Sequence, residues 1–477
     1  MQNHQRILLL VSTGVFMSTM DSSMVNVALP TLMKVFAGSL AVTEWVVLIY
    51  LLTITVTLLF WGHLSNSIGQ GRLYSRGVLL FTLGSLFCSL SPSIEMLIFF
   101  RFVQATGASM MMAMGPALIN SSYPRTQLGQ GLGMIGIATS LGLMSGPAVS
   151  GVLLRWSHWR FIFLVTVPVG LVVYVFFRRI LIPIGEPVQS SGLGEKFDVP
   201  GGILYLLAIV VSVLLLTHTG TGNSQQAGIN WSRYLLVVAP MLWLLFVAHE
   251  LRSKQPLLPV RLFKNRFYTM AMLSAMLSFV VLFFVLLLMP FYLSSLRGFA
   301  PDRVGFFMMA VPLCVFFVAP LAGRLHDKIG ARIIASFGLG GSLTSLLLLT
   351  RLTADSSPAF IVSVLALLGF GQAMFLAPNS AAALSGVAHD KSGITSSLLA
   401  TSRNMGMLLG TALAGYIFAE TYAQLTGGMD IRDFSSGQSA QFVRALQLTF
   451  AVGSGIGALA VVASWMRGHP DSEKREK

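Results

Sequence analysis

The chain is divided into about fourteen apolar runs of roughly twenty residues, and this division constrains its fold more than any other feature. A helix rises 1.5 Å per residue and needs about twenty apolar residues to cross the roughly 30 Å hydrocarbon core of a bilayer. Unpaired backbone groups are not tolerated in hydrocarbon, and the runs lack the alternation of barrel strands, so we predict an all-α integral membrane protein. The runs begin near Ile7, Trp45, Ser75, Met96, Leu132, Phe161, Val199, Tyr234, Phe267, Val304, Ile333, Phe360, Ile394 and Leu446.

Composition supports a lipid environment and excludes several classes of function. Hydrophobic residues make up 55% of the chain and charged residues 10%, which is too little polar surface to cover a soluble particle. Cys88 and Cys314 lie in different predicted spans and provide no metal spacing or disulfide framework. The sequence contains neither a G-x-x-x-x-G-K-[ST] loop nor an H-E-x-x-H motif. We therefore expect no metal, no cofactor and no enzymatic activity.

The net charge of +14 raises the question of a nucleic-acid partner, but the positions of the basic residues indicate membrane topology instead. If the amino terminus is cytoplasmic, twenty of the 31 lysines and arginines fall on the cytoplasmic side and nine on the other, while Arg101 and Arg403 fall inside spans. This bias predicts a multi-pass protein of the cytoplasmic (inner) membrane with both termini cytoplasmic. Its expected partner is the lipid bilayer, with no nucleic acid, and we expect a functional monomer.

An internal repeat predicts the domain organisation. The second run is followed by Gly62-His-Leu-Ser-Asn66-Ser-Ile-Gly69 and the tenth by Gly323-Arg-Leu-His-Asp327-Lys-Ile-Gly330. The shared pattern, G-x-L-x-[ND]-x-I-G, marks equivalent positions in two related halves. Because the second copy follows the tenth run rather than the eighth, two additional helices lie between the halves. We predict a six-helix bundle over 1–182, linkers and two additional helices over 183–266, and a second six-helix bundle over 267–477.

Several motifs in chain order carry a family resemblance that covers nearly the whole chain. The repeated loop resembles the signature loop of the major facilitator superfamily, and the other motifs resemble its fourteen-span drug:H+ antiporters, of the EmrB and QacA type. The resemblance implies the major facilitator fold, with two six-helix bundles and two additional central helices, and proton-coupled multidrug or antiseptic export. The matching residues are Asp21, Val27, Ala28 and Pro30; Trp45 and Tyr50; Arg101, Gln104 and Gly107; Gly142, Gly146, Pro147 and Gly151; Trp159, Arg160, Phe163, Pro168 and Gly170; and Gly369, Gly371, Pro378, Asn379, Gly393, Ser396, Arg403, Gly406 and Gly410.

The glycines of the predicted fifth span have a physical reading of their own. Gly142 and Gly146 lie four residues apart on one helix face, where the absence of side chains lets two backbones approach closely. Pro147 removes an internal hydrogen bond and bends the helix. With Gly151 these residues resemble the antiporter motif G-x-x-x-G-P-x-x-G-G, in which Ser150 replaces the first paired glycine. Ordinary tight packing is the alternative; the resemblance implies a role in the conformational change and in preventing leak.

Two ionisable residues inside spans are the candidates for proton coupling. Asp21 lies within an apolar run, where a carboxylate costs at least ~2.5 kcal/mol unless it is paired, hydrated or protonated. Burial is expected to favour its protonated form, so it could take up a proton on one side and release it on the other. Arg101 stays charged and is expected to bias the proton affinity of a nearby carboxylate. The alternative for Asp21 is a permanent hydrogen bond between helices.

The two repeated loops are candidate cytoplasmic gates. The first copy has Asn66 in the acidic position and lacks the charge relay of the family, whereas the second retains Asp327 beside Lys328. An ion pair that closes the gate could therefore form in the second half, and a solvated loop is the alternative. The predicted gate residues are Gly62, Asn66, Gly69, Gly323, Asp327, Gly330 and Arg332.

The expected activity follows from the spans, the intramembrane acid and the resemblance together. We expect a secondary antiporter that exports small amphipathic or cationic compounds by alternating access. An exporter of a single metabolite is the main alternative, and a non-transporting sensor is a third possibility that the lack of an output domain disfavours. For Arg403, anchoring to backbone carbonyls is as good an interpretation as a transport role. Candidate cavity residues are Asn26, Trp45, Tyr50, Gln104, Asn379 and Arg403.

Overall fold

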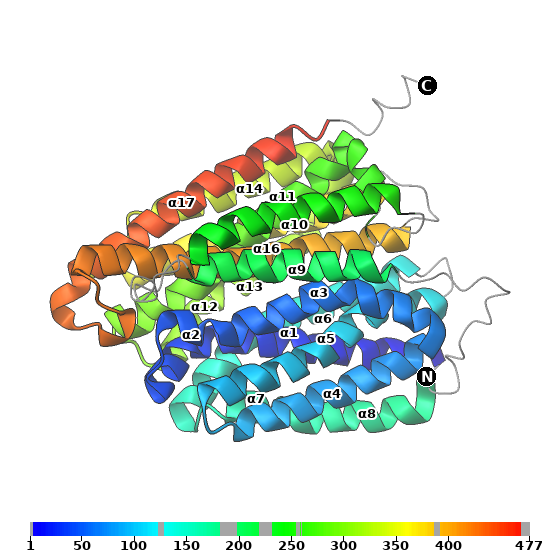
Figure 1. Cartoon of the computed structure of the whole chain (residues 1–477), viewed down its shortest axis with the longest axis horizontal. Coiled ribbons are helices and arrows are strands. Elements are labelled where there is room, and N and C mark those ends of the chain that lie inside the picture. The colour runs from blue at the N-terminus through cyan, green and yellow to red at the C-terminus, as the bar shows by residue number, and fades with distance from the viewer. Residues whose placement is uncertain are drawn as a thin grey trace. The chain divides into compact units, whose positions relative to one another are not determined.

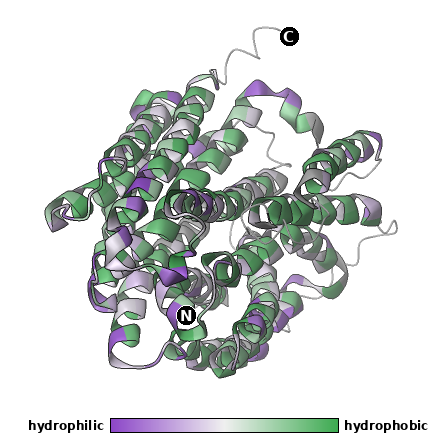
Figure 2. Ribbon diagram, turned by 60° about the vertical axis from the view of Figure 1, so that its left-hand side comes forward, coloured by the Kyte–Doolittle hydropathy of each residue, from purple (hydrophilic) through white to green (hydrophobic). Residues whose placement is uncertain are grey.

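The computed structural model is built from helices, and it contains no strand among the residues that it describes, which are 3–122, 128–181, 198–218, 231–253, 258, 260–385 and 392–468 (Figure 1). Thirteen helical stretches in these ranges are long and apolar enough to cross a membrane. Helix α16 (Ser392–Thr426), which contains the run expected from Ile394, is also long enough but less apolar. Figure 2 shows hydrophobic residues along most of the helical ribbon. The predicted all-α membrane fold is confirmed.

The first compact unit comprises Met1–Gly38, Trp45–Phe197 and Ala300–Met309. Within it α1 packs against α6, α4 against α5, and α3 against α5, so that α5 is a central element of the packing. Its helices are α1 (Asn3–Phe36), α3 (Trp45–Ile68), α4 (Gln70–Leu90), α5 (Ile94–Ser122), α6 (Leu128–Trp156), α7 (Phe161–Leu164), α8 (Thr166–Leu181) and α12 (Pro301–Met308).

The second compact unit comprises Ser39–Glu44, Asp198–Phe299 and Ala310–Lys477. Here α11 packs against α16 and α17, α15 packs against α13 and α14, and the pair α9–α10 packs through α9 onto α16. Besides α16, its α-helices are α2 (Leu40–Thr43), α9 (Val199–His218), α10 (Trp231–Arg252), α11 (Arg266–Phe291), α13 (Ala310–Ile329), α14 (Ala331–Leu349), α15 (Pro358–Ser385) and α17 (Ser439–Trp465). Four short helices complete it, of which η4 has π geometry: η3 (Val260–Lys264), η4 (Tyr292–Leu296), η6 (Ile431–Asp433) and η7 (Ser436–Gln438).

Two short segments pack with a unit to which their neighbours along the chain do not belong. Helix α2, between α1 and α3, packs against α16 in the second unit, and α12, which precedes α13, packs against α6 in the first. Of the predicted linker, which runs from Pro183 to Asp198, residues 183–197 lie outside the described residues. The predicted domain boundaries therefore remain predictions.

The repeated loops share one backbone conformation. Gly69 separates α3 from α4 with φ 90° and ψ 136°, and Gly330 separates α13 from α14 with φ 91° and ψ 155°. Each glycine donates its N–H to the carbonyl four residues earlier, on Ser65 and His326, at 2.9 Å. This region of backbone space is essentially closed to residues with a β-carbon. The last glycine of the repeated pattern is thus required by the same turn in both units.

We expect Gly69→Ala and Gly330→Ala each to destabilise the protein by about 1–3 kcal/mol, because alanine would be strained at this φ. The measurement is thermal unfolding of the purified protein in detergent.

Gly62→Ala and Gly323→Ala are matched controls from the same two motifs. A β-carbon there meets nothing within 4 Å, and neither glycine has a positive φ. Alanine at these helical positions should be neutral or slightly stabilising. Equal losses in all four variants would contradict the strain argument.

A polar cluster joins the starting end of α9 to the last turn of α10. Asp198 caps α9 by accepting a hydrogen bond from the Gly201 N–H at 3.0 Å, and His249 Nε2 lies 2.9 and 3.0 Å from its two carboxylate oxygens. Burial, the largest single influence, raises the pKa of Asp198. The hydrogen bonds from Gly201, His249 and Ser253 and the charge of His249 together outweigh it, so the pKa lies below its ordinary value. The carboxylate is therefore a stabilising cap in its ionised form.

This direction predicts the pH dependence of the cap. Because the folded-state pKa of Asp198 is lowered, its contribution is present above the unfolded-state pKa of about 3.9 and is lost as the pH falls through the folded-state value. Asp198→Ala should lower stability by about 1 kcal/mol at neutral pH, and this difference should shrink below about pH 4. Asp198→Asn, which retains a cap, should lose less. Thermal unfolding against pH checks both variants, and a difference that grows in acid would refute the assignment.

Candidate functional site

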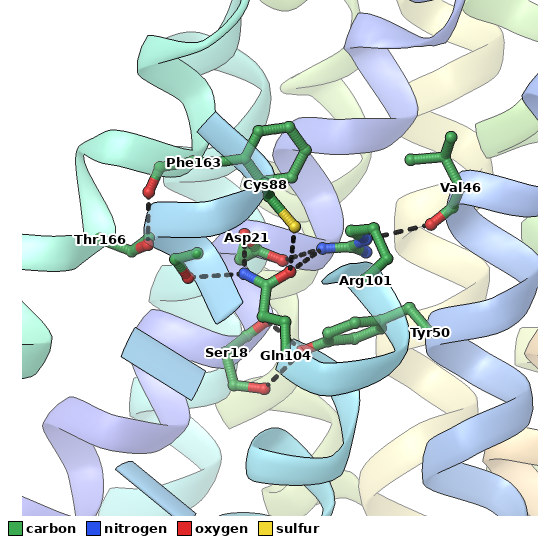
Figure 3. Close-up of polar contacts among 10 residues, drawn as sticks. Ser18, Asp21, Val46, Tyr50, Cys88, Arg101, Gln104, Phe163 and Thr166 are labelled. Carbon is green, nitrogen blue, oxygen red and sulfur yellow. Dashed lines mark hydrogen bonds and ion pairs between the residues drawn. The ribbon is translucent and has the colours of Figure 1, made fainter. Parts of the chain in front are cut away.

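An ion pair between α1 and α5 lies at the centre of the site in the first unit (Figure 3). Arg101 Nη1 on α5 lies 2.5 Å from Asp21 Oδ2 on α1, and their side chains are 1% and 0% exposed. Charges buried this completely persist when they are paired and their remaining groups are hydrogen-bonded. The structure thus brings together the two residues predicted to take part in proton coupling.

Gln104, one turn after Arg101, completes the cluster. Its Nε2 donates to Asp21 Oδ1 at 2.9 Å and to Ser85 Oγ on α4 at 2.7 Å, while its Oε1 accepts from Arg101 Nη1 at 2.7 Å. Both carboxylate oxygens of Asp21 are consequently engaged. The spacing of three residues places Arg101 and Gln104 on one face of α5, directed at α1.

Arg101 has partners that do not depend on Asp21. Its Nε donates to the carbonyl of Val46 on α3 at 3.0 Å. The guanidinium carbon lies 4.1 Å from the centre of the Tyr50 ring, and the Tyr50 hydroxyl is hydrogen-bonded to Ser18 Oγ at 2.9 Å (Figure 3). A carbonyl and an aromatic face both stabilise a guanidinium, so two contacts of Arg101 do not change when the charge of Asp21 changes.

The antiporter-like motif holds α6 directly against the helix that carries Asp21. A β-carbon on Gly142 would collide with Thr19, and one on Gly146 would lie 2.6 Å from the β-carbon of Ser23. Ser150, which replaces a glycine of the family pattern, donates its hydroxyl to the carbonyl of Met24 at 2.9 Å. Close helix packing is therefore an observed property of Gly142 and Gly146, and Ser150 adds a hydrogen bond to the same seam.

The end of this motif contacts α12. A β-carbon on Gly151 would lie 2.7 Å from the carbonyl oxygen of Pro301, and one on Gly305 would collide with the carbonyl of Pro147. One turn beyond Gly151, Arg155 forms an ion pair with Asp302, with the two side chains 51% and 27% exposed. The α6 motif thus has two packing partners, α1 through its first glycines and α12 through its last residues.

The structure describes only some of the predicted gate residues in full. Gly69 and Gly330 form the turns described above, whereas the side chains of Asn66 and Asp327 lie outside the described residues. Arg332 places its guanidinium carbon 4.6 Å from the centre of the Trp465 ring, which joins α14 to α17. The proposed ion pair of the second loop therefore remains a prediction.

The candidate cavity residues fall into two groups. Tyr50 and Gln104 belong to the Asp21 cluster, and in the same unit Asn26 is 5% exposed and Trp45 is partly buried. In the second unit the candidate side chains, Asn379 and Arg403, form hydrogen bonds with residues of the same unit. Asn379 Nδ2 donates to the Ala271 carbonyl at 3.2 Å, and Arg403 Nη2 donates to Ser380 Oγ at 2.6 Å.

Three buried charged residues were not recognised from the sequence: Arg467, Glu44 and, on α10, Glu250, which is 3% exposed. Arg467, just beyond α17, is 1% exposed and donates to Ser274 Oγ at 3.0 Å and to Asn379 Oδ1. Burial lowers the pKa of its guanidinium to about 10. The sequence provides no signal for this burial, because Arg467 follows the last apolar run and looks like an interfacial anchor.

Glu44, just before α3, is 2% exposed, and its Oε2 has no hydrogen-bond partner among the described residues. It lies so close to Gly415 on α16 that a β-carbon there would collide with its carboxylate. Its position beside the run that starts at Trp45 gave no signal for this burial, because charged residues at the ends of apolar runs usually face water. In the described part of the chain, no group of three His, Cys, Asp or Glu side chains is arranged to hold a metal.

Comparison with known proteins identifies the family. The model of the Major Facilitator Superfamily matches residues 11–411 and, in a second match, 271–477. The chain is 35% identical over 420 residues to the riboflavin transporter RibZ of Clostridioides difficile (strain 630), covering 88% of this chain and 89% of RibZ. It is 30% identical over 426 residues to the multidrug resistance protein Stp of Mycobacterium tuberculosis (strain ATCC 25618 / H37Rv), covering 87% and 76% of the two chains.

The fold agrees with a solved structure of the same architecture. A bacterial homologue of the human lysosomal transporter Spinster, in an inward-facing and unoccupied conformation, has a TM-score of 0.67 at 14% sequence identity. The match covers 98% of this chain and 97% of that one. From the family match, the relatives and the shared fold, we conclude that the chain belongs to the major facilitator superfamily of membrane transporters.

Proposed function

We propose that this transporter is a proton-coupled antiporter of the fourteen-span drug:H+ type that exports small amphipathic or cationic compounds by alternating access. The buried cluster of Asp21, Arg101 and Gln104 is the observation that carries the proposal, because it holds a carboxylate inside the predicted spans with a charge partner that never loses its proton. A relative named as a multidrug resistance protein supports the choice of substrate class.

In this conformation both oxygens of Asp21 are occupied, so proton uptake requires that one of its contacts open. The contact with Gln104 is the weaker of the two, since it joins a neutral amide to a carboxylate, whereas Arg101 contributes a charged donor. We propose that Gln104 moves away as the cavity opens, that the exposed oxygen of Asp21 takes up a proton, and that closure of the contact expels it.

Protonation converts a neutral pair into a cluster with one positive charge. A buried charge in the bilayer costs at least ~2.5 kcal/mol unless it is matched, so the protonated cluster favours a conformation in which water reaches Arg101. The Val46 carbonyl and the Tyr50 ring hold the guanidinium in place meanwhile. The proton therefore binds more tightly in one of the two conformations than in the other. This difference in affinity is what couples proton binding to the conformational change.

The close packing of α6 on α1 suggests how protonation of Asp21 can move other helices of the unit. Gly142, Gly146 and Ser150 hold α6 on α1 along the same stretch that carries Asp21. A displacement of α1 therefore displaces α6 and its contact with α12. We further propose a multi-pass monomer in the inner membrane with both termini cytoplasmic, acting on protons and a small-molecule substrate.

A second candidate is specific transport of one metabolite. It is favoured by the 35% identity to a relative named as a riboflavin transporter, nearly all of which the chain covers. The paired Asp21 serves proton coupling equally well in this case. The two candidates differ in substrate range, not in the driving mechanism.

Proton coupling is tested by three variants: Asp21→Asn, Arg101→Gln and the double variant. Removing one partner leaves the other buried without a match, at a cost of about 3–5 kcal/mol, whereas removing both costs less. We expect the double variant to recover the thermal stability lost by the single variants but to show no proton-driven transport. The measurements are unfolding in detergent and collapse of a preformed pH gradient in everted vesicles on addition of substrate.

Recovery of both stability and proton-driven transport in the double variant would mean that the pair is only structural. A Thr13→Ser variant serves as the control. It removes a methyl group on the same helix and keeps the hydroxyl that donates to the Leu9 carbonyl, so it should behave as the parent protein.

The substrate class is tested by a panel of amphipathic cations and riboflavin in the same vesicles. The drug-export proposal predicts that several chemically unrelated cations collapse the pH gradient and compete with one another. Collapse by riboflavin alone would instead establish the single-metabolite candidate. Asp21→Asn vesicles provide the baseline for each compound.

A further inference from the structure

The two additional helices, α9 and α10, border a cavity together with α11 and α16, all within the second unit. Its volume is about 220 Å³. It is partly open to the surroundings of the protein. The lining comes from four helices: Ile209, Ser212 and Val213 of α9, Trp243 of α10, Met276 of α11, and Met405, Leu408 and Leu409 of α16.

The lining is apolar, and the two polar side-chain groups in it already have hydrogen-bond partners within the protein. Trp243 Nε1 donates to Ser212 Oγ at 3.1 Å, and Ser212 donates to the carbonyl of Ala208 at 2.7 Å. No polar group of this lining is therefore left for water, which needs two to four polar partners to occupy a cavity stably. Apolar cavities of about 150 Å³ stay dry and bind apolar molecules, so this larger one suits an apolar occupant.

The position of the cavity along the bilayer normal indicates which apolar molecule would occupy it. Trp243 is nine residues from Arg252, the exposed last residue of α10, and Met276 is ten residues from Arg266, the exposed first residue of α11. At 1.5 Å per residue these separations are about 14 and 15 Å. The hydrocarbon core is about 30 Å thick, so the cavity lies near its middle. The abundant molecules at that depth are the ends of lipid acyl chains.

Much of the surface of α9 and α10, the two additional helices that border the cavity, is exposed. The spans of α9 and α10 have only 28% and 17% of their residues buried, the latter the smallest share among the thirteen stretches. Many of their large apolar side chains are exposed on the protein surface, as expected where lipid covers it. These exposed residues are Val199, Ile203, Leu206 and Leu207 on α9 and Tyr234, Leu236, Val237, Val238, Met241, Leu244, Leu245, Val247 and Leu251 on α10.

We propose that this cavity is a binding site for one acyl chain of a phospholipid from the leaflet on the side of Arg252 and Arg266. The two exposed guanidinium groups mark the depth at which an anionic headgroup would lie. Met276 and Met405 are unbranched and flexible, and therefore adapt to chains of different shape. The bound chain fills the space between the additional helix pair and the main bundle.

The cavity adjoins a close contact between α11 and α16. A β-carbon on Gly406, the residue after Met405, would collide with the carbonyl of Met276. The acyl chain thus packs beside the seam of α11 and α16 and stabilises the docking of α9 onto α16. This role is independent of the substrate and of the driving ion.

The test uses the full chain in nanodiscs of phosphatidylethanolamine and phosphatidylglycerol, doped with phosphatidylglycerol that carries a photoreactive group at the end of one acyl chain. After irradiation, labelled residues are located by peptide mass spectrometry. We expect labels on Trp243, Met276 and Met405. Two variants from different helices, Met276→Phe and Leu409→Trp, fill the cavity and should each reduce this labelling at least about fivefold, equivalent to roughly 1 kcal/mol.

Leu244→Phe is the matched control, because Leu244 is 72% exposed on α10 next to Trp243 and does not line the cavity. It should leave the labelling of the cavity residues unchanged. If one filling variant fails to fold, the other still decides the question. Equal labelling of the parent protein and a folded filling variant would overturn the proposal, as would labelling confined to exposed residues of α10.

A second, independent measurement is the quenching of tryptophan fluorescence by lipids that are brominated at the ends of their acyl chains. They should quench the part of the tryptophan fluorescence that is lost in Trp243→Phe, and the quenching should fall in the filling variants. Quenching by a soluble halogenated aromatic without quenching by brominated lipid would assign the cavity to a small ligand and overturn the acyl-chain proposal.

Discussion

A charge buried among apolar helices has to be matched, and in the first unit this requirement joins α1, α3, α4 and α5 at one point. The Arg101 guanidinium is held by a carboxylate, an amide oxygen, a backbone carbonyl and an aromatic face, each from a defined position on one of these helices. Removing the carboxylate alone would leave the guanidinium charge buried without an opposite charge, which is strongly destabilising. The cluster therefore both organises the unit and provides it with an ionisable group.

Close backbone approach is the second condition on which this arrangement depends. The hydrogen bonds of Asp21 require α1 to stay in register with α5, and α6 supports α1 from another side through Gly142 and Gly146. Within the second unit Gly406 and Gly410 bring α16 against α11 in the same way. In hydrocarbon, where apolar burial does not drive helices together, such contacts supply much of the packing energy.

The sequence identified Asp21 and Arg101 as residues of interest because an ionisable side chain in an apolar run is costly, and the motif placed Gln104 beside Arg101 by spacing alone. It could not show that Ser85 and Val46 complete the cluster, since serine and a backbone carbonyl carry no comparable signal. Tyr50 was singled out as a motif and cavity residue, but the sequence could not show that its ring lies over Arg101. Glu44 and Arg467 were missed because both lie at the ends of apolar runs, where charged residues usually face water.

The sequence by itself determined that the chain crosses the membrane as helices, since apolar runs of this length have no other stable conformation in lipid, and it determined the repeated turn, since the conformation of Gly69 and Gly330 excludes side chains. The tertiary structure alone decided which buried charges meet, where Glu44 and Arg467 are sequestered, and that α9, α10, α11 and α16 leave a cavity between them. The physical reason is that hydropathy and backbone preference are local properties, whereas the matching of charges and the filling of space depend on helices that are distant in the chain.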